Sequence, residues 1–202
     1  MAKTPRPAAL EEKIRLTGIA GIGRSVGCTH FSVMLANYLA GYQRKRAALL
    51  EFNHSGAFAR IEKSCTGYIR KEKLCRILEA DYFKDAGPIE LAIAFEKNYE
   101  ELLIDFGDIE EDGWTEFLRC DRQFLIGSFS EWQQARFRDF ELKKRPAERK
   151  SWQSLAVFGS EETRREFRKR YRIFTERIPF SADAFAVTEE CARFFGRLMK
   201  DT

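Results

Sequence analysis

Short apolar runs alternate with amphipathic stretches along the chain, and this alternation is the first indication of its fold. Strand-like runs cover 14–20, 46–52, 99–107, 122–129, 151–159 and 171–180. Helical spacing of apolar residues predicts helices from the first loop to about residue 43 and over 88–98, 113–120, 131–144, 160–170 and 188–199, with a brief helix or loop over 55–64. Strands that alternate with helices predict an α/β fold, a mostly parallel central sheet with helices on both faces.

Polar residues predict where three of these helices begin. Ser130, Ser160 and Thr188 each precede a helical stretch, and a hydroxyl side chain at that position accepts a hydrogen bond from the first turn. The segment 64–86 matches neither the helical spacing of apolar residues nor the alternation of a strand, and a strand is expected only within 75–83.

The length of 202 residues fits one globular domain with a sizeable core. We therefore assign 14–202 to a single domain and 1–13 to a short flexible leader. Pro146 and the charged run 143–150 predict a loop inside this domain.

Composition excludes several classes of protein. No apolar run reaches the about 18–20 residues that cross a bilayer, and the start lacks the apolar stretch of a signal peptide, so we expect a cytoplasmic protein. The five cysteines are scattered and odd in number, and there are two histidines, which argues against a disulfide framework or a zinc site. The tryptophans are expected in the core or half-buried, with a partner surface as the alternative: Trp114, Trp132 and Trp152.

Charge is distributed unevenly along the chain, although the net charge is only +4. Residues 79–121 hold 14 acidic and 3 basic residues, whereas 136–177 hold 14 basic and 7 acidic residues. Most of these charges are expected on solvated helix faces; the alternative that such a division suits is a partner surface or contact between two protomers. Within the basic region 136–177, the arginine-rich 164–172 is interpreted as a solvated surface, with contact with DNA or with an anionic membrane surface as the alternative.

The segment GIAGIGRSVGCTHF, residues 18–31, has the layout of a phosphate-binding loop that opens a helix. Backbone N–H groups of such loops surround phosphates, and the helix adds its positive N-terminal end. The common pattern GxxxxGK[ST] also provides a lysine for the phosphates and a hydroxyl for Mg²⁺. Gly27 and Thr29 keep the last glycine and the hydroxyl, whereas Ile22 and Cys28 replace the first glycine and the lysine. The pattern predicts a degenerate nucleotide site.

The order of motifs resembles the ParA/MinD-type deviant P-loop ATPases, whose loop reads KGGxGK[ST]. In this comparison Gly23 stands for the signature lysine that reaches the nucleotide of the partner protomer. The remaining matches are Arg24 and Ser25 for two glycines, Val26 for the variable position, Gly27 for the third glycine, Cys28 for the phosphate lysine and Thr29 for the hydroxyl. The resemblance implies that these residues line a nucleotide site and that the protein dimerises.

Three later segments extend the resemblance over about residues 14–200. LLEFN (49–53) resembles the DxD segment of the second strand, with Glu51 and Asn53 for its two aspartates. LLIDFG (102–107) resembles the Walker B strand and keeps its acid, Asp105, while RIPFSADAF (177–185) resembles the IPxD loop beside the base pocket. The resemblance implies that Thr29 and Asp105 hold Mg²⁺ if ATP binds.

Every departure from the ParA/MinD-type pattern is expected to weaken the binding and hydrolysis of a nucleotide. Both lysines are absent, and a charge-assisted hydrogen bond contributes roughly 1.5–3 kcal/mol, which corresponds to about tenfold to a hundredfold in affinity. Hydrolysis depends even more on positive charge, so we assign no catalytic residue. Arg24 is the alternative phosphate clamp. Cys28 is interpreted as a small filler, with a reactive thiolate as the alternative; Asp105 is either a ligand-binding acid or a relic that orders the loop.

A degenerate loop on this fold also resembles the TadZ/CpaE-type proteins, relatives that help to position pilus-assembly machinery. We therefore expect a regulatory or scaffold protein that acts through protein binding, without a certain cofactor and with ATP/Mg²⁺ bound weakly if at all. A slow Mg²⁺-dependent ATPase switch is the alternative. A DNA- or membrane-surface-binding protein of the partition type is a further alternative.

Overall fold

A single twisted sheet organises the part of the chain that the computed structural model describes, residues 14–109, 111–144 and 152–200. Its eight strands lie in the order β3-β4-β2-β5-β1-β6-β7-β8. Neighbouring strands are parallel except for β3 and β4, which are antiparallel. The bounds are β1 Arg15–Gly21, β2 Ala47–Glu51, β3 Leu74–Ile77, β4 Ala80–Phe83, β5 Glu101–Asp108, β6 Arg122–Ser128, β7 Gln153–Val157 and β8 Thr175–Arg177. The predicted leader 1–13 and the loop around Pro146 lie outside the described residues.

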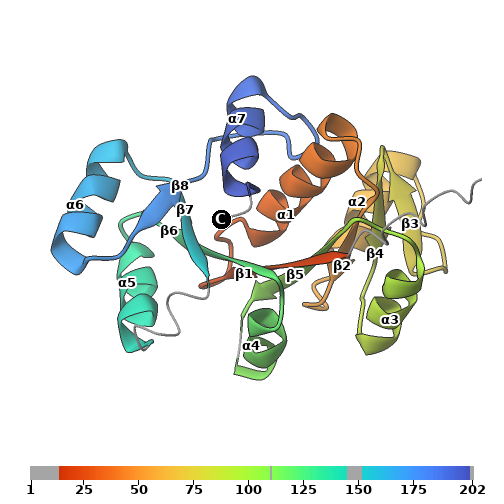
Figure 1. Cartoon of the computed structure of the whole chain (residues 1–202), viewed down its shortest axis with the longest axis horizontal. Helices are drawn as coiled ribbons and strands as arrows, with labels where there is room; N and C mark the ends of the chain where they lie inside the picture. Colours follow the sequence, from red (N-terminus) through yellow and green to blue (C-terminus); the bar gives the residue numbers. More distant parts are fainter. Residues whose placement is uncertain (1–13, 110, 145–151, 201–202) are drawn as a thin grey trace, which may run out of the picture.

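Helices cover both faces of the sheet (Figure 1). Their bounds are α1 Cys28–Asn37, α2 Ala57–Thr66, α3 Pro88–Glu96, α4 Glu111–Leu118, α5 Gln134–Lys143, α6 Glu161–Tyr171 and α7 Glu189–Leu198, and α1 continues into a π-helical turn, η1, Tyr38–Tyr42. In Figure 1, α1, α2 and α7 lie above the sheet, and α3, α4 and α5 lie below it. The predicted α/β fold class is confirmed.

The central strands are apolar on both faces because helices bury both faces. Neighbouring residues of β5 show this directly: Leu103 belongs to the core under α1 and α7, whereas Ile104 belongs to the core over α4 and α5. Both side chains are buried. Among the described helices, none is long and apolar enough to span a membrane.

Most predicted elements have counterparts, but two details of the sequence prediction were wrong. Ser160 and Thr188 cap α6 and α7 by accepting hydrogen bonds from Thr163 N and Cys191 N. Ser130 does not cap α5, which begins only at Gln134, because Ser130 instead begins a turn in which its carbonyl accepts from Gln133 N and Gln134 N. The expected single strand within 75–83 is a hairpin of β3 and β4.

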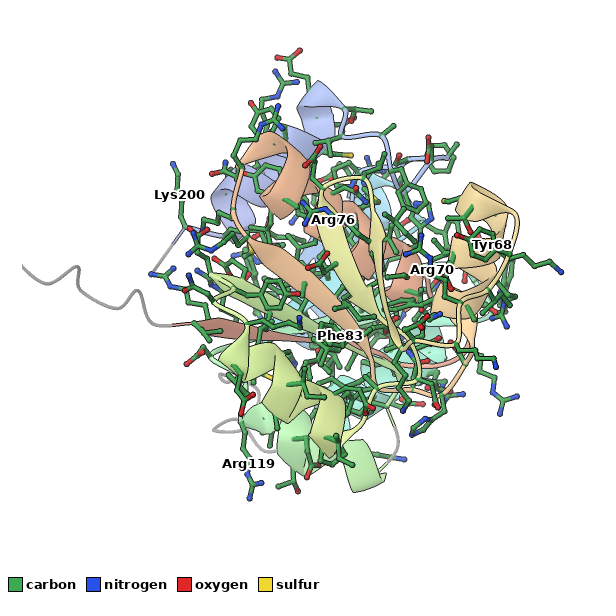
Figure 2. All side chains as sticks on the ribbon, turned by 90° about the vertical axis from the view of Figure 1, so that its right-hand side faces the viewer. Tyr68, Arg70, Arg76, Phe83, Arg119 and Lys200 are labelled. Carbon is green, nitrogen blue, oxygen red and sulfur yellow. The ribbon has the colours of Figure 1, made fainter. Side chains whose placement is uncertain are left out.

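A buried ion pair holds the segment 67–73 against the sheet beside this hairpin. Lys84 Nζ lies 2.6 Å from Glu62 Oε2, and both side chains are almost fully buried. Lys84 also donates to the carbonyl of Arg70, whose N–H in turn donates to Glu62 Oε2. Figure 2 looks onto this edge of the molecule, with Tyr68 and Arg70 at the segment. The pair thereby connects α2, the segment 67–73 and the end of β4.

We predict that Lys84→Met lowers the free energy of unfolding by about 3 kcal/mol, because the buried Glu62 carboxylate then keeps only the more distant guanidinium of Arg70, 3.8 Å from its Oε1. Urea denaturation of the two proteins measures the difference. The double variant Glu62→Gln/Lys84→Met is expected to recover most of the loss, since it removes the unpaired charge. A single variant within about 1 kcal/mol of wild type would contradict a structural role for the pair.

Candidate nucleotide site

The predicted phosphate loop connects β1, at the centre of the sheet, to the first turn of α1. Gly21 has no room for a side chain, since a Cβ there would lie 2.8 Å from Val26 Cγ2. Gly27 precedes α1 with a φ of 80°, a conformation that favours glycine. Ser25 also has a positive φ, 61°, at a position where the ParA/MinD-type pattern has glycine. The loop therefore turns as a phosphate loop does, with strain at Ser25.

A cleft of about 1010 Å³ opens above this loop. All seven predicted loop residues, Gly23–Thr29, line it, and the ends of β2 and β5 form its other side. The cleft is lined opposite the loop by Phe52, Asn53, His54, Ser55, Pro88, Phe106, Gly107, Asp108, Ile109, Gly113 and Glu116. Among the described residues that line it, none is a lysine, and the basic side chains are Arg24, His30 and His54.

Asp105, the eighth predicted site residue, is fully buried beneath the cleft at the end of β5. Its Oδ2 accepts a hydrogen bond from Thr29 Oγ1 at 2.6 Å. Its Oδ1 accepts from Cys28 Sγ at 3.1 Å and from the backbone N–H of Gly107 at 2.9 Å. The carboxylate thus fastens the first turn of α1 to the end of β5 through three donors.

Burial decides the protonation of this cluster. It raises the pKa of the Asp105 carboxyl, while the hydroxyl, thiol and N–H donors act in the opposite direction. Burial, together with the neighbouring Asp105 charge, raises the pKa of the Cys28 thiol well above its ordinary value. Cys28 is therefore protonated at neutral pH and donates its hydrogen bond inward. This geometry supports the filler interpretation over the reactive thiolate.

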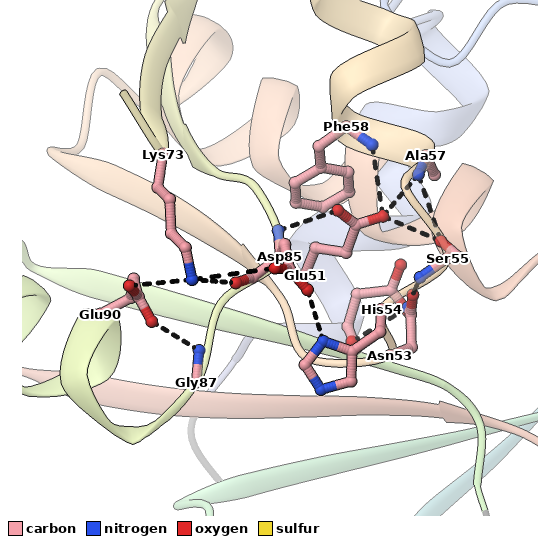
Figure 3. A network of polar contacts seen from close by, with 11 residues as sticks. Glu51, Asn53, His54, Ser55, Ala57, Phe58, Lys73, Asp85, Gly87 and Glu90 are labelled. Atoms are coloured by element: carbon pink, nitrogen blue, oxygen red, sulfur yellow. Dashed lines mark hydrogen bonds and ion pairs between the residues drawn. The ribbon is translucent and has the colours of Figure 1, made fainter. Parts of the chain in front are cut away.

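Glu51, matched to the first aspartate of the DxD segment, is fully buried and points away from the loop. Its Oε1 accepts hydrogen bonds from Ser55 Oγ and from the N–H groups of Ala57 and Phe58, while its Oε2 accepts from Asp85 N (Figure 3). Glu51 therefore caps the N-terminus of α2.

Asn53, matched to the second aspartate, forms hydrogen bonds with the backbone on both sides of its amide group. Its Nδ2 donates to the Asp105 carbonyl at 3.2 Å, and its Oδ1 accepts from Ser55 N. Figure 3 shows it beside His54, whose Nδ1 lies 2.5 Å from Asp85 Oδ1. Both matched positions thus support the loop that follows β2.

Sequence reasoning missed three residues that contact the loop from its other side. Asp108 Oδ1 accepts from the N–H of Gly23 at 2.8 Å, and Arg136 Nη2 lies 3.4 Å from the same oxygen. Gln133 Nε2 donates to the carbonyl of Arg24. The sequence could have indicated Asp108, because it is a second acid three residues after Asp105, at the end of the same strand. Nothing in the sequence connects Arg136 or Gln133 to the loop.

Comparison with known proteins identifies the fold. No family model and no curated protein matches the sequence. Among solved structures, MinD from Aquifex aeolicus matches with a TM-score of 0.65 and 14% identity over 93% of this chain and 98% of that one. A ParA family ATPase from Chlorobium tepidum matches with 0.64 and 13% over 86% and 88% of the two chains. A plasmid partition protein from Borrelia burgdorferi B31, bound to AMPPNP, matches with 0.62 and 12% over 93% and 97%.

The chain has the ParA/MinD fold. At these identities the likeness establishes the architecture, including the position of the loop between β1 and α1. It does not transfer a ligand, so the nucleotide-binding assignment of residues Gly23–Thr29 and Asp105 stays a prediction.

The described lining of the cleft opposes tight binding of a magnesium nucleotide, since it contains no lysine. The Thr29 hydroxyl donates its hydrogen to Asp105 and keeps its oxygen lone pairs for a cation, while the Asp105 oxygens accept from three donors of the chain itself. The Gly23 N–H is bonded to a carboxylate, which would repel a phosphate at the same place. The exposed guanidinium of Arg24 is left as a phosphate clamp.

We predict that Asp105→Ala lowers the free energy of unfolding, whereas Asp105→Asn raises it at neutral pH. Asp105→Ala leaves the donors of Thr29 and Gly107 without an acceptor and lowers the free energy of unfolding by about 2 kcal/mol or more. Asp105→Asn keeps an acceptor and cannot ionise, so it avoids the cost of a buried charge. Thermal unfolding of the ligand-free proteins measures both effects.

The pH dependence of the free energy of unfolding is a second test of this prediction. Because the folded state raises the Asp105 pKa above its ordinary value of 3.8, native wild type holds this proton more tightly than the unfolded chain does. Wild type therefore loses stability relative to Asp105→Asn as pH rises from 3.8 through the raised pKa. An Asp105→Ala variant as stable as wild type would instead indicate an acid reserved for a ligand.

Proposed function

We propose that this protein is a regulatory or scaffold protein with the ParA/MinD fold and a degenerate nucleotide site, which acts by binding another protein. The observation that supports it most strongly is the state of Asp105, whose carboxylate is satisfied inside the chain by Thr29, Cys28 and Gly107. An acid used in this way stabilises the loop without a ligand. Efficient hydrolysis is not expected from such a site.

The charge of the cleft supports the same proposal. Phosphoryl transfer relies on positive groups that stabilise charge on the transferred phosphate. Here the described cleft offers Arg24 and two histidines, while Asp108 and Glu116 line it as acids. Arg24 alone supports weak binding of ATP/Mg²⁺, which keeps the slow ATPase switch as the alternative.

Exposed aromatic residues follow three neighbouring strands of the sheet. Trp132, Phe158 and Phe180 are exposed by 79%, 58% and 83%, and they follow the adjacent parallel strands β6, β7 and β8. Phe158 is presented with a φ of 58°, which is costly for a bulky side chain. We infer that these exposed aromatic side chains contribute to a surface that binds a protein partner. The prediction that the tryptophans lie in the core or half-buried holds for Trp114 and Trp152, whereas Trp132 is exposed.

The structural neighbours guide the choice of partner in this proposal. A solved neighbour is the MinC:MinD complex of Aquifex aeolicus, which shows that protein with its partner bound. For this chain we propose either a homodimer or a partner from an assembly machinery, with spatial organisation of pilus or secretion assembly as the process that its resemblance to TadZ/CpaE-type proteins implies.

Calorimetric titration with ATP and ADP, with and without Mg²⁺, tests the proposal. We expect affinities no tighter than about 0.1–1 mM, because the lysine contributions are missing. Hydrolysis is expected to be no faster in wild type than in Thr29→Ala. Micromolar binding with Mg²⁺-dependent hydrolysis that Thr29→Ala abolishes would contradict the proposal and establish the ATPase switch.

A specific observation favours a second candidate function, contact with DNA or an anionic membrane through the basic region. Along α6 and just after it, Arg165, Arg168, Lys169 and Arg172 line a hollow together with the exposed Phe174. Within the described residues these four cations form no ion pair, whereas Arg164 on the same helix pairs with Glu161. The guanidinium of Arg168 stacks on Phe174, 4.7 Å from the ring centre.

We predict that Arg165→Glu/Lys169→Glu weakens binding to duplex DNA and anionic vesicles and flattens the salt dependence of DNA binding by roughly two phosphate contacts. The matched control is Lys97→Glu/Arg119→Glu, which makes the same charge change at two other exposed positions; Figure 2 shows Arg119 near the foot of the molecule. Fluorescence anisotropy and vesicle sedimentation measure the two ligands. Equal losses in both variants would indicate a general charge effect and remove this candidate.

A further inference from the structure

A carboxylate of the chain itself occupies the start of the phosphate loop. Asp108 lies at the end of β5, and its Oδ1 accepts the Gly23 N–H at 2.8 Å. Both residues line the cleft, so the bond forms where a ligand would approach. The backbone fixes this contact, because Ile109 N donates to the carbonyl of Gly21 and keeps the two segments in register. The loop donor is therefore held by an anion before any ligand arrives.

Side chains of α5 and the turn before it complete the contact. The guanidinium of Arg136 lies against Gly23, since a Cβ at that glycine would be 3.2 Å from Arg136 Nε. The same guanidinium lies 3.4 Å from Asp108 Oδ1 and offsets its charge. Gln133 adds a hydrogen bond to the carbonyl of Arg24. Two segments far apart in the sequence, the end of β5 and residues 133–136, thus hold residues 23 and 24.

We propose that Asp108 is a built-in anion that takes the place of phosphate at this loop and excludes phosphate ligands from it. The inference rests on the proposed function, because it explains why a phosphate-type loop works without nucleotide. Loops of this kind gather N–H groups that favour negative charge, and an internal carboxylate satisfies that preference permanently. A phosphate that entered would lose the Gly23 donor and face the Asp108 charge at close range.

The carboxylate, and not the arginine, is the excluding group in this proposal. Arg136 is cationic and by itself would attract phosphate. Removing Arg136 leaves Asp108 on the loop without its counterion, so the affinity for anions should not rise. Removing Asp108 frees the Gly23 N–H and leaves Arg136 beside the loop as an additional cation, so the affinity should rise.

The experiment titrates pyrophosphate into wild type, Asp108→Ala, Asp108→Asn, Arg136→Ala and Glu116→Gln, followed by calorimetry and by the amide NMR signal of Gly23. We expect Asp108→Ala to bind pyrophosphate at least about tenfold more tightly than wild type, with the Gly23 signal shifting on binding. Asp108→Asn keeps an oxygen acceptor and should gain less. Glu116→Gln is the matched control, since it removes one negative charge from the same cleft with no bond to the loop.

Three results would overturn the inference. They are an unchanged affinity in both Asp108 variants, an equal gain in Glu116→Gln, and a gain in Arg136→Ala as large as that in Asp108→Ala. If Asp108→Ala does not fold, Asp108→Asn decides the question, because it keeps the bond to Gly23 while removing the charge. The proposed function fails on a different result, ATP hydrolysis by wild type, so the two failures are distinguishable.

Discussion

The buried carboxylate of Asp105 is the interaction on which the arrangement of the site depends. It ties Thr29 and Cys28, in the first turn of α1, to Gly107 at the end of β5. Burying an acid is costly unless hydrogen bonds compensate, and here three donors supply that compensation. The loop between β1 and α1 consequently has a fixed anchor inside the protein.

This anchor explains why the loss of the phosphate lysine is structurally tolerable. Cys28 is small enough to lie inward and to donate its weak hydrogen bond to Asp105, whereas the start of the loop is held by Asp108. Two acids of β5 thus stabilise the two ends of the loop from within. The loop between β1 and α1 can then keep its shape while Asp108 places a carboxylate against it.

Much of the fold was predictable because its signals are local. The apolar runs became β1, β2, β5, β6 and β7, and the hydroxyl caps Ser160 and Thr188 begin their helices as predicted. The sequence did not predict the hairpin β3–β4, because its strands are only four residues long. The turn between them places Leu78 at a φ of 52°, and leucine is not a residue from which such a turn is predicted. Ser130 failed as a cap because it bonds with Ser128 and Gln133 in a turn of its own.

The sequence alone determined the α/β class, the place of the loop and the absence of a lysine at Gly23 and Cys28, because periodicity and residue identity are properties of neighbours along the chain. It left open whether Asp105 serves a ligand or the fold. Only the tertiary structure decided the partners of Asp105 and brought Asp108, Gln133 and Arg136 to the loop, with up to 109 positions between bonded residues. Contacts across such separations depend on how strands and helices pack, which no local pattern encodes.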